Sequence, residues 1–151
     1  MNRLDGKIAI VTGGTQGLGA AVARQFAHAG VTGLVTCGRN IPKGEEVAST
    51  IEGDHDIPVR FVRADLAELA DCVAVVKAAE DTFGRADILV NAAGLTDRGT
   101  LLDTTPDLFD RMFAVNVRAP FFLMQETVRV MIREEIAGSI VNIGSASAYA
   151  G

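Results

Sequence analysis

The sequence predicts an α/β protein built around a doubly wound parallel sheet. Apolar runs of strand length alternate with longer segments of helical period along the 151 residues, which is the pattern of strand–helix–strand units. The first apolar run, residues 7–11, leads into a glycine-rich turn and then a helix, as is typical of such sheets. We therefore expect one domain over residues 1–151, with strand order 3-2-1-4-5 and right-handed crossovers.

The first half of the chain supplies three strands and two helices. A helix over residues 17–29 follows the glycine turn and stops at Gly30, which can adopt the left-handed conformation of a helix end. The apolar run 34–37 is the second strand. Pro42 opens a second helix where its missing N–H does no harm, and Gly53 is expected to close it. Residues 58–62 form the third strand.

The second half supplies two more strands and two helical segments. A helix over residues 67–83 ends at Gly84, and residues 87–90 form the fourth strand. Thr105 caps a long helical segment that reaches to about residue 135 and contains Pro120. Because proline lacks an N–H, the carbonyl of Asn116 cannot receive its usual helical hydrogen bond. Residues 138–143 are the fifth strand.

Composition excludes several classes of partner. The formal net charge is −5, the pI is near 5.0 and basic residues are scattered, so we expect no nucleic-acid binding. No apolar run has the length of a membrane span, and the first residues lack a signal-peptide core, so we expect a soluble, cytoplasmic protein without membrane contact. Cys37 and Cys72 are expected to be reduced apolar residues, His28 and His55 ordinary surface residues, and no metal site is expected.

The turn Thr12-Gly13-Gly14-Thr15-Gln16-Gly17-Leu18-Gly19 is the strongest candidate site. Gly13 allows a sharp exit from the strand, Gly17 lets the backbone approach a ligand, and Gly19 lets the helix pack on the sheet. The free N–H groups of the following helix favour an anion, of which a pyrophosphate is the natural one. A tight strand–helix connection or another kind of nucleotide site would fit these eight residues as well.

Two further polar segments follow strand ends. Residues Asn91-Ala92-Ala93-Gly94 follow the fourth strand, and Ser145 follows the fifth. In an open α/β sheet the ends of strands one, four and five are neighbours, and ligands bind in the crevice outside them. The three segments are therefore expected to meet in one crevice.

These motifs resemble the short-chain dehydrogenase/reductase family, whose cofactor turn is spaced T-G-x-x-x-G-x-G. The resemblance implies a Rossmann-like dinucleotide-binding domain in which Gly13, Thr15, Gln16, Gly17, Leu18 and Gly19 bind the cofactor, as do Asp65, Leu66, Asn91, Ala92, Ala93 and Gly94. It implies catalytic roles for Ser145 and Asn116. Taken alone, Asp65 could end a strand, Asn91 could satisfy a turn, Asn116 could be a surface amide and Ser145 a loop serine.

The family's catalytic tyrosine and lysine have no counterpart here. That tyrosine follows the serine by about a dozen residues with the lysine four positions later, so both would lie beyond Gly151; Tyr149 is too close. We therefore expect the amino-terminal portion of a longer oxidoreductase acting on a small carbonyl or secondary alcohol, lacking the family's last strands and itself inactive. The alternative is a catalytically silent nucleotide-binding or regulatory protein.

The second strand bears on the choice of cofactor. No acidic residue follows it to hold a ribose 2′-hydroxyl, and Arg39 is placed to bind a 2′-phosphate, so NADP is favoured with NAD as the alternative. The apolar residues Phe113, Phe121, Phe122 and Met124 resemble the family's dimer-forming surface, although most could face the core. A homo-oligomer, a dimer or a homotetramer, is expected on this ground.

Overall fold

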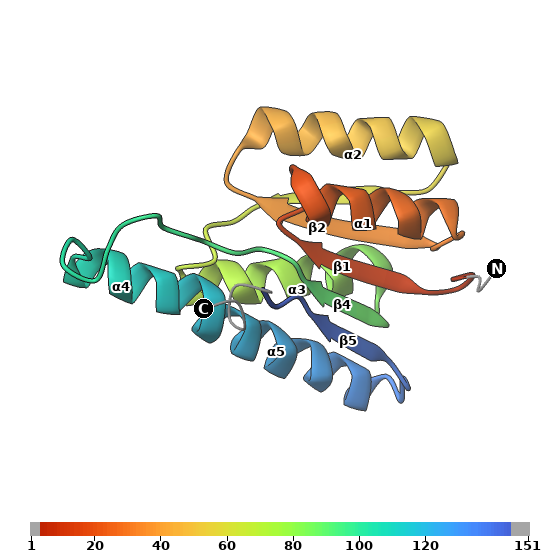
Figure 1. The fold of residues 1–151 in the computed structure, drawn as a ribbon. Coiled ribbons are helices and arrows are strands. Elements are labelled where there is room, and N and C mark those ends of the chain that lie inside the picture. Colours follow the sequence, from red (N-terminus) through yellow and green to blue (C-terminus); the bar gives the residue numbers. More distant parts are fainter. Residues whose placement is uncertain (1–3, 146–151) are drawn as a thin grey trace.

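The computed structural model describes residues 4–145, in which five parallel strands form one sheet in the order β3-β2-β1-β4-β5 (Figure 1). The strands are β1 Ile8–Thr12, β2 Gly33–Gly38, β3 Val59–Arg63, β4 Ile88–Asn91 and β5 Ser139–Asn142. The predicted strand order and Rossmann-like class are confirmed. The order reverses beside β1, which places the carboxyl ends of β1 and β4 next to each other.

Helices cover both faces of the sheet. On one face, α1 (Gly17–His28) and α2 (Ile41–His55) bury a core that includes Ala23 and Ile51. On the other, α3 (Leu69–Phe83) and α5 (Ala119–Arg133) bury a second core that includes Val75 and Leu123. The central strands are mostly apolar because both of their faces are covered, and in β1 all five residues are buried.

Most helix ends agree with the sequence, and one does not. Gly84 ends α3 with a φ of 72°, as predicted. Gly53, however, lies inside α2, which continues to His55 and ends at Asp56 with a φ of 53°. The predicted closure at Gly53 is wrong because an aspartate can also take the left-handed conformation, so glycine is not required there.

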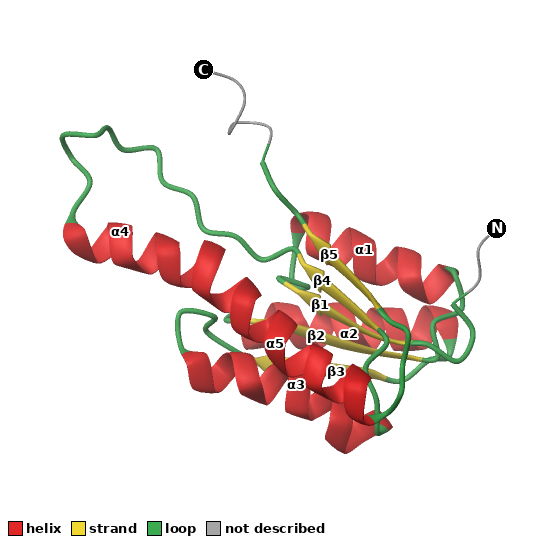
Figure 2. Cartoon of the chain, turned by 90° about the horizontal axis from the view of Figure 1, so that it is seen from below, coloured by secondary structure: helices red, strands yellow, loops and turns green. Residues whose placement is uncertain are grey.

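The single long helical segment predicted before β5 is divided into three parts. Thr105 caps α4 (Pro106–Phe113) by accepting a hydrogen bond from the N–H of Leu108 at 3.2 Å. A π-helical turn, η1 (Ala114–Arg118), follows, and α5 begins directly after it. Pro120 explains the π turn, because its missing N–H and its ring disturb the regular hydrogen-bond ladder just upstream. Figure 2 shows α4 and the loop before it projecting beyond the sheet.

Strand β5 forms one edge of the sheet. It has four residues, and the side chains of Val141 and Ile143 at its end are 46% and 43% exposed. Both cysteines are free and buried, as predicted. The rings of His28 and His55 lie edge to face with centroids 6.3 Å apart, a contact that the sequence did not predict. No helix in the described part of the chain has the length and apolar character needed to cross a membrane.

Candidate functional site

A cleft of about 270 Å³ opens at the carboxyl ends of β1, β2 and β4. The residues predicted from sequence that line it are Gly13, Thr15, Gln16, Gly17, Leu18, Gly19, Arg39, Asp65, Leu66, Ala92, Ala93 and Gly94. The glycine turn, the segment after β3 and the segment after β4 therefore surround one space. Asn91, Asn116 and Ser145 are not among its lining residues.

The glycine turn is packed as tightly as a backbone allows. A Cβ atom on Gly19 would lie 2.3 Å from the carbonyl oxygen of Gly13, so only glycine brings α1 this close to the end of β1. Gly17 has a φ of 56°, and a Cβ atom there would meet nothing within 4 Å. The first residues of α1 line the cleft, and the N–H groups at the start of a helix are a favourable site for an anion.

Thr12 fastens the glycine turn to the segment after β4. Its buried hydroxyl accepts hydrogen bonds from the N–H groups of Ala92 and Ala93, both at 3.1 Å, and donates to the carbonyl of Val90 at 3.4 Å. A Cβ atom on Gly13 would lie 2.9 Å from the Cα of Ala93, so the two backbones touch here. One hydroxyl therefore joins these two segments on the same side of the cleft.

Asn91 holds β4 to β5 below the cleft. Its side-chain Nδ2 donates to Oδ1 of Asn142 at 2.8 Å, and these two residues are partners in the strand register. The Asn91 side chain is buried and its Oδ1 has no hydrogen-bond partner among the described residues. In this structure Asn91 joins the strands that carry the site and does not line the cleft itself.

Asn116 holds the segment after β4 from the other side. Its Oδ1 accepts from the N–H of Leu95 at 2.8 Å, and its Nδ2 donates to the carbonyl of the same residue at 2.7 Å. The side chain is thus fully engaged in fixing the start of the 95–105 loop. Any contribution of Asn116 to proton transfer would fall to its main-chain carbonyl, which Pro120 cannot pair with.

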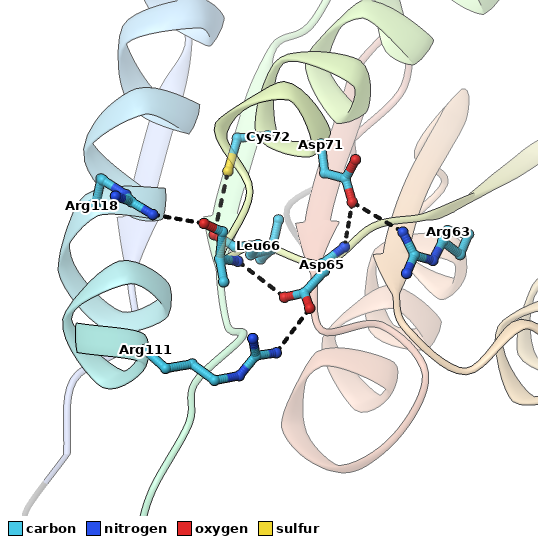
Figure 3. Close-up of polar contacts among 8 residues, drawn as sticks. Arg63, Asp65, Leu66, Asp71, Cys72, Arg111 and Arg118 are labelled. Carbon is cyan, nitrogen blue, oxygen red and sulfur yellow. Dashed lines mark hydrogen bonds and ion pairs between the residues drawn. The ribbon is translucent and has the colours of Figure 1, made fainter. Parts of the chain in front are cut away.

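Asp65 lies at the centre of a polar cluster at the far end of the cleft (Figure 3). Its carboxylate accepts from the N–H of Ala67 at 3.1 Å and from Nη2 of Arg111 at 2.8 Å. Burial disfavours the charge of this group, but Arg111 and Ala67 favour it more strongly, so the pKa of Asp65 lies below its usual value. A carboxylate held in this way is ionised at neutral pH.

The loop that carries Asp65 is anchored on both sides. Its backbone N–H donates to Oδ2 of Asp71 in α3 at 2.7 Å, and Arg63 pairs with the same oxygen at 3.3 Å. On the other side of the loop, Nη2 of Arg118 in η1 donates to the carbonyl of Ala67 at 2.7 Å (Figure 3). The loop of Asp65 is therefore held by two helical elements that are distant in sequence, by α3 through Asp71 and by η1 through Arg118.

Arg39 and Cys37 occupy the end of β2. Arg39 is exposed, and none of the described residues holds its guanidinium in a hydrogen bond or an ion pair, although its charge helps to lower the pKa of Asp65. Cys37 lines the cleft, but burial raises the pKa of its thiol to about 12, so it is not a nucleophile at neutral pH. Arg39 is thus an exposed cation that lines the cleft and has no partner among the described residues.

The predicted catalytic positions are only partly described. Ser145 is exposed and lies three residues after β5, at the edge of the sheet where the carboxyl ends of all the strands lie. Tyr149 lies outside the described residues. Sequence reasoning missed Arg111 and Val115, which line the cleft from α4 and η1. Arg111 contacts a residue 46 positions away, and no local pattern indicates such a pairing.

Comparisons with known proteins agree with this geometry. A family model described as short chain dehydrogenase matches residues 7–151. Versicolorin reductase 1 of Dothistroma septosporum is 35% identical over 146 residues, which are 97% of this chain and 54% of that protein. The NADP-dependent (R)-specific alcohol dehydrogenase of Lentilactobacillus kefiri is 34% identical over 150 residues, covering 99% of this chain and 58% of that protein.

Solved structures give the same result. The L-sorbose reductase of Gluconobacter frateurii, solved with NADPH and L-sorbose, is 30% identical with a TM-score of 0.92, covering 98% of this chain and 56% of that one. The chain spans about half the length of the curated relatives it matches. The family model, these relatives and the shared fold together show that the chain belongs to the short-chain dehydrogenase family.

Proposed function

We propose that this chain is the cofactor-binding part of an oxidoreductase that uses NADP(H) to interconvert a carbonyl and a secondary alcohol. The observation that carries the proposal is the cleft itself, in which the amino-terminal turn of α1 and the unpaired Arg39 face one space. The NADP-dependent Lentilactobacillus relative and the NADPH complex of the sorbose reductase support the choice of cofactor.

The residues present fit such a cofactor. The N–H groups at the start of α1 would hold the pyrophosphate, Arg39 would hold the 2′-phosphate, and Asp65 and Leu66 would border the adenine. A bound nicotinamide would supply or accept the hydride. By resemblance to the family, Ser145 would steady the substrate oxygen, and the Asn116 carbonyl would hold a water molecule for proton transfer.

The test is a cofactor-binding measurement on the purified chain. Arg39→Ala should weaken NADPH binding about tenfold and leave NADH binding nearly unchanged, because only the 2′-phosphate loses its partner. Arg60→Ala is the matched control, since Arg60 is exposed on the neighbouring strand and does not line the cleft. An unchanged ratio of NADPH to NADH affinity in Arg39→Ala would show that the NADP assignment is wrong.

A turnover assay separates the enzyme from the silent nucleotide-binding protein that the sequence also allows. Both bind NADPH, but only the enzyme oxidises it when small ketones or aldehydes are supplied. We propose in addition that the 151 residues alone turn over poorly, because no tyrosine–lysine pair follows Ser145 in this sequence. Measurable NADPH oxidation by the 151-residue chain would contradict that part.

We propose a homo-oligomer that associates through the helical segment α4–η1–α5. Phe113, Val117 and Phe121, spaced four residues apart on it, are each more than half exposed and line a groove of about 680 Å³. Phe121→Asp should lower the molecular mass measured by analytical ultracentrifugation. A mass equal to one chain for the unmodified protein would contradict the proposal. A cytoplasmic location stays a prediction from the sequence.

A further inference from the structure

Two arginines on different elements lie near one carboxylate at the end of the cleft. Arg111, in α4, donates to Oδ2 of Asp65 at 2.8 Å, and its side chain is 38% exposed. Arg39, after β2, lines the same cleft and lowers the pKa of Asp65 by its charge. Of the two arginines, only Arg111 forms a hydrogen bond and an ion pair with the Asp65 carboxylate.

We propose that Arg111 is a positioning residue for cofactor selection, which occupies the carboxylate of Asp65 and thereby leaves Arg39 available for a 2′-phosphate. The inference rests on the proposed function, since it concerns how the same cleft distinguishes NADP from NAD. Arg111 is 72 positions from Arg39 in the sequence, and both residues act on the carboxylate of Asp65.

The physical reason is competition for one cation. A carboxylate and a phosphate offer a guanidinium similar charge-assisted hydrogen bonds. Without Arg111, Asp65 would lose its ion-pair partner, and Arg39 would be the remaining cation that acts on its carboxylate. Arg39 would then have to leave Asp65 before it could bind a phosphate, and the unpaired carboxylate would also repel that phosphate.

The two other arginines of the cluster around Asp65 already have partners. Arg118 is committed to the carbonyl of Ala67 at 2.7 Å, and Arg63 pairs with Asp71 (Figure 3). The N–H of Ala67 already donates to the other oxygen of Asp65 at 3.1 Å. Loss of Arg111 would therefore leave the Oδ2 side of Asp65 open to Arg39.

The experiment is a double-mutant cycle read out by NADPH and NADH dissociation constants. Arg111→Gln should weaken NADPH binding about tenfold and change NADH binding by less than about twofold. Adding Asp65→Asn should restore NADPH binding to within about threefold of the Asp65→Asn single variant, because no carboxylate then competes for Arg39. Arg129→Gln, which removes an exposed ion pair with Glu126 in α5, is the control and should change neither constant.

Each other outcome overturns the proposal. Equal weakening of NADPH and NADH would mean that Arg111 only supports the fold of the cleft. A loss of NADPH binding that Asp65→Asn does not rescue would mean that Arg111 contacts the phosphate itself. If Arg111→Gln does not fold, Arg111→Gln in the Asp65→Asn background still tests the proposal, since any selective loss of NADPH binding there contradicts it. Absence of binding of either cofactor to the unmodified chain would instead refute the proposed function, and this inference with it.

Discussion

The two walls of the cleft are held together in different ways. The glycine-turn wall, formed by residues 12–19 and 92–93, depends on backbone contact and on the buried hydroxyl of Thr12. The α4 wall, formed by α4 and η1, depends on the hydrogen bonds of three polar side chains, those of Arg111, Asn116 and Arg118. The first wall is closely packed and buried, whereas the second is linked to the site through partly exposed hydrogen bonds.

Under the proposed function, the cleft has to bind the part that all dinucleotides share and also to distinguish one ligand from another, and the two walls suit these two requirements differently. A wall built from touching backbones cannot change its shape, so it suits the pyrophosphate that every dinucleotide shares. A wall tied by arginine and asparagine side chains can be altered by single substitutions without disturbing the core. Under the proposed function, substitutions in the α4 wall are therefore expected to change cofactor selectivity in addition to those at Arg39, whereas substitutions in the glycine-turn wall are expected to change stability.

The largest expected effect is on the glycine-turn wall. In Gly19→Ala the new methyl group would lie 2.3 Å from the backbone oxygen of Gly13, and a backbone atom in this position cannot move aside cheaply. We expect the free energy of unfolding, measured by urea titration, to fall by about 3 kcal/mol. Cofactor binding should weaken as well, because the start of α1 has to shift.

Gly53→Ala is the matched control for this prediction. Gly53 lies within α2, and a Cβ atom there would meet nothing within 4 Å. The same substitution should raise the free energy of unfolding by about 0.5 to 1 kcal/mol, because alanine is the better helix former. Equal effects of the two substitutions would show that the glycine-turn wall is not the rigid one.

The second prediction compares two buried threonines of the sheet. Thr12→Val keeps the shape of the side chain but leaves the N–H groups of Ala92 and Ala93 without their acceptor. We expect a loss of about 2 kcal/mol in the free energy of unfolding. Thr36→Val should be neutral or slightly stabilising, because the equally buried hydroxyl of Thr36 has no partner among the described residues. If both variants lose the same stability, Thr12 does not brace the wall in the way described.

The glycine-turn wall is also the part that could be predicted from the sequence. The turn of residues 12–19 and the segment after β4 are marked by glycine spacing and apolar runs, and the strand order follows from the connection rules of parallel sheets. The cap at Thr105 and the helix end at Gly84 follow in the same way. The extension of α2 past Gly53 could not, since Asp56 carries no stronger signal than any other turn residue.

The α4 wall could not be predicted because no local sequence pattern marks the side chains that hold it. Arg111 and Asp65 are 46 positions apart, and Arg118 and Ala67 are 51 apart. Nothing in the residues around Arg111 distinguishes it from a solvated helix arginine. The sequence points to the main-chain carbonyl of Asn116. Only the fold shows that its side chain also forms two hydrogen bonds with the backbone of Leu95.

The smallest expected effect concerns the pH dependence of the α4 wall. The folded-state pKa of Asp65 lies below the ordinary value of 3.8, so its ion pair with Arg111 contributes stability above about pH 3.8. That contribution is lost as the pH falls through the lower, folded-state pKa. Because the Arg111 side chain is 38% exposed and screened by solvent, we expect at most about 1 kcal/mol.

The measurement is an NMR titration of the Asp65 carboxyl carbon. The unmodified chain should titrate below 3.8, and Arg111→Gln should move the midpoint upward because the carboxylate loses its cation. The glycine-turn wall is the internal reference, since Gly13, Gly19 and Thr12 do not titrate, and the stability lost in Gly19→Ala should therefore not vary with pH. A midpoint that does not move in Arg111→Gln would show that Asp65 is held by its backbone contacts alone. The two walls would then be equally insensitive to charge, and the α4 wall would not be the adjustable one.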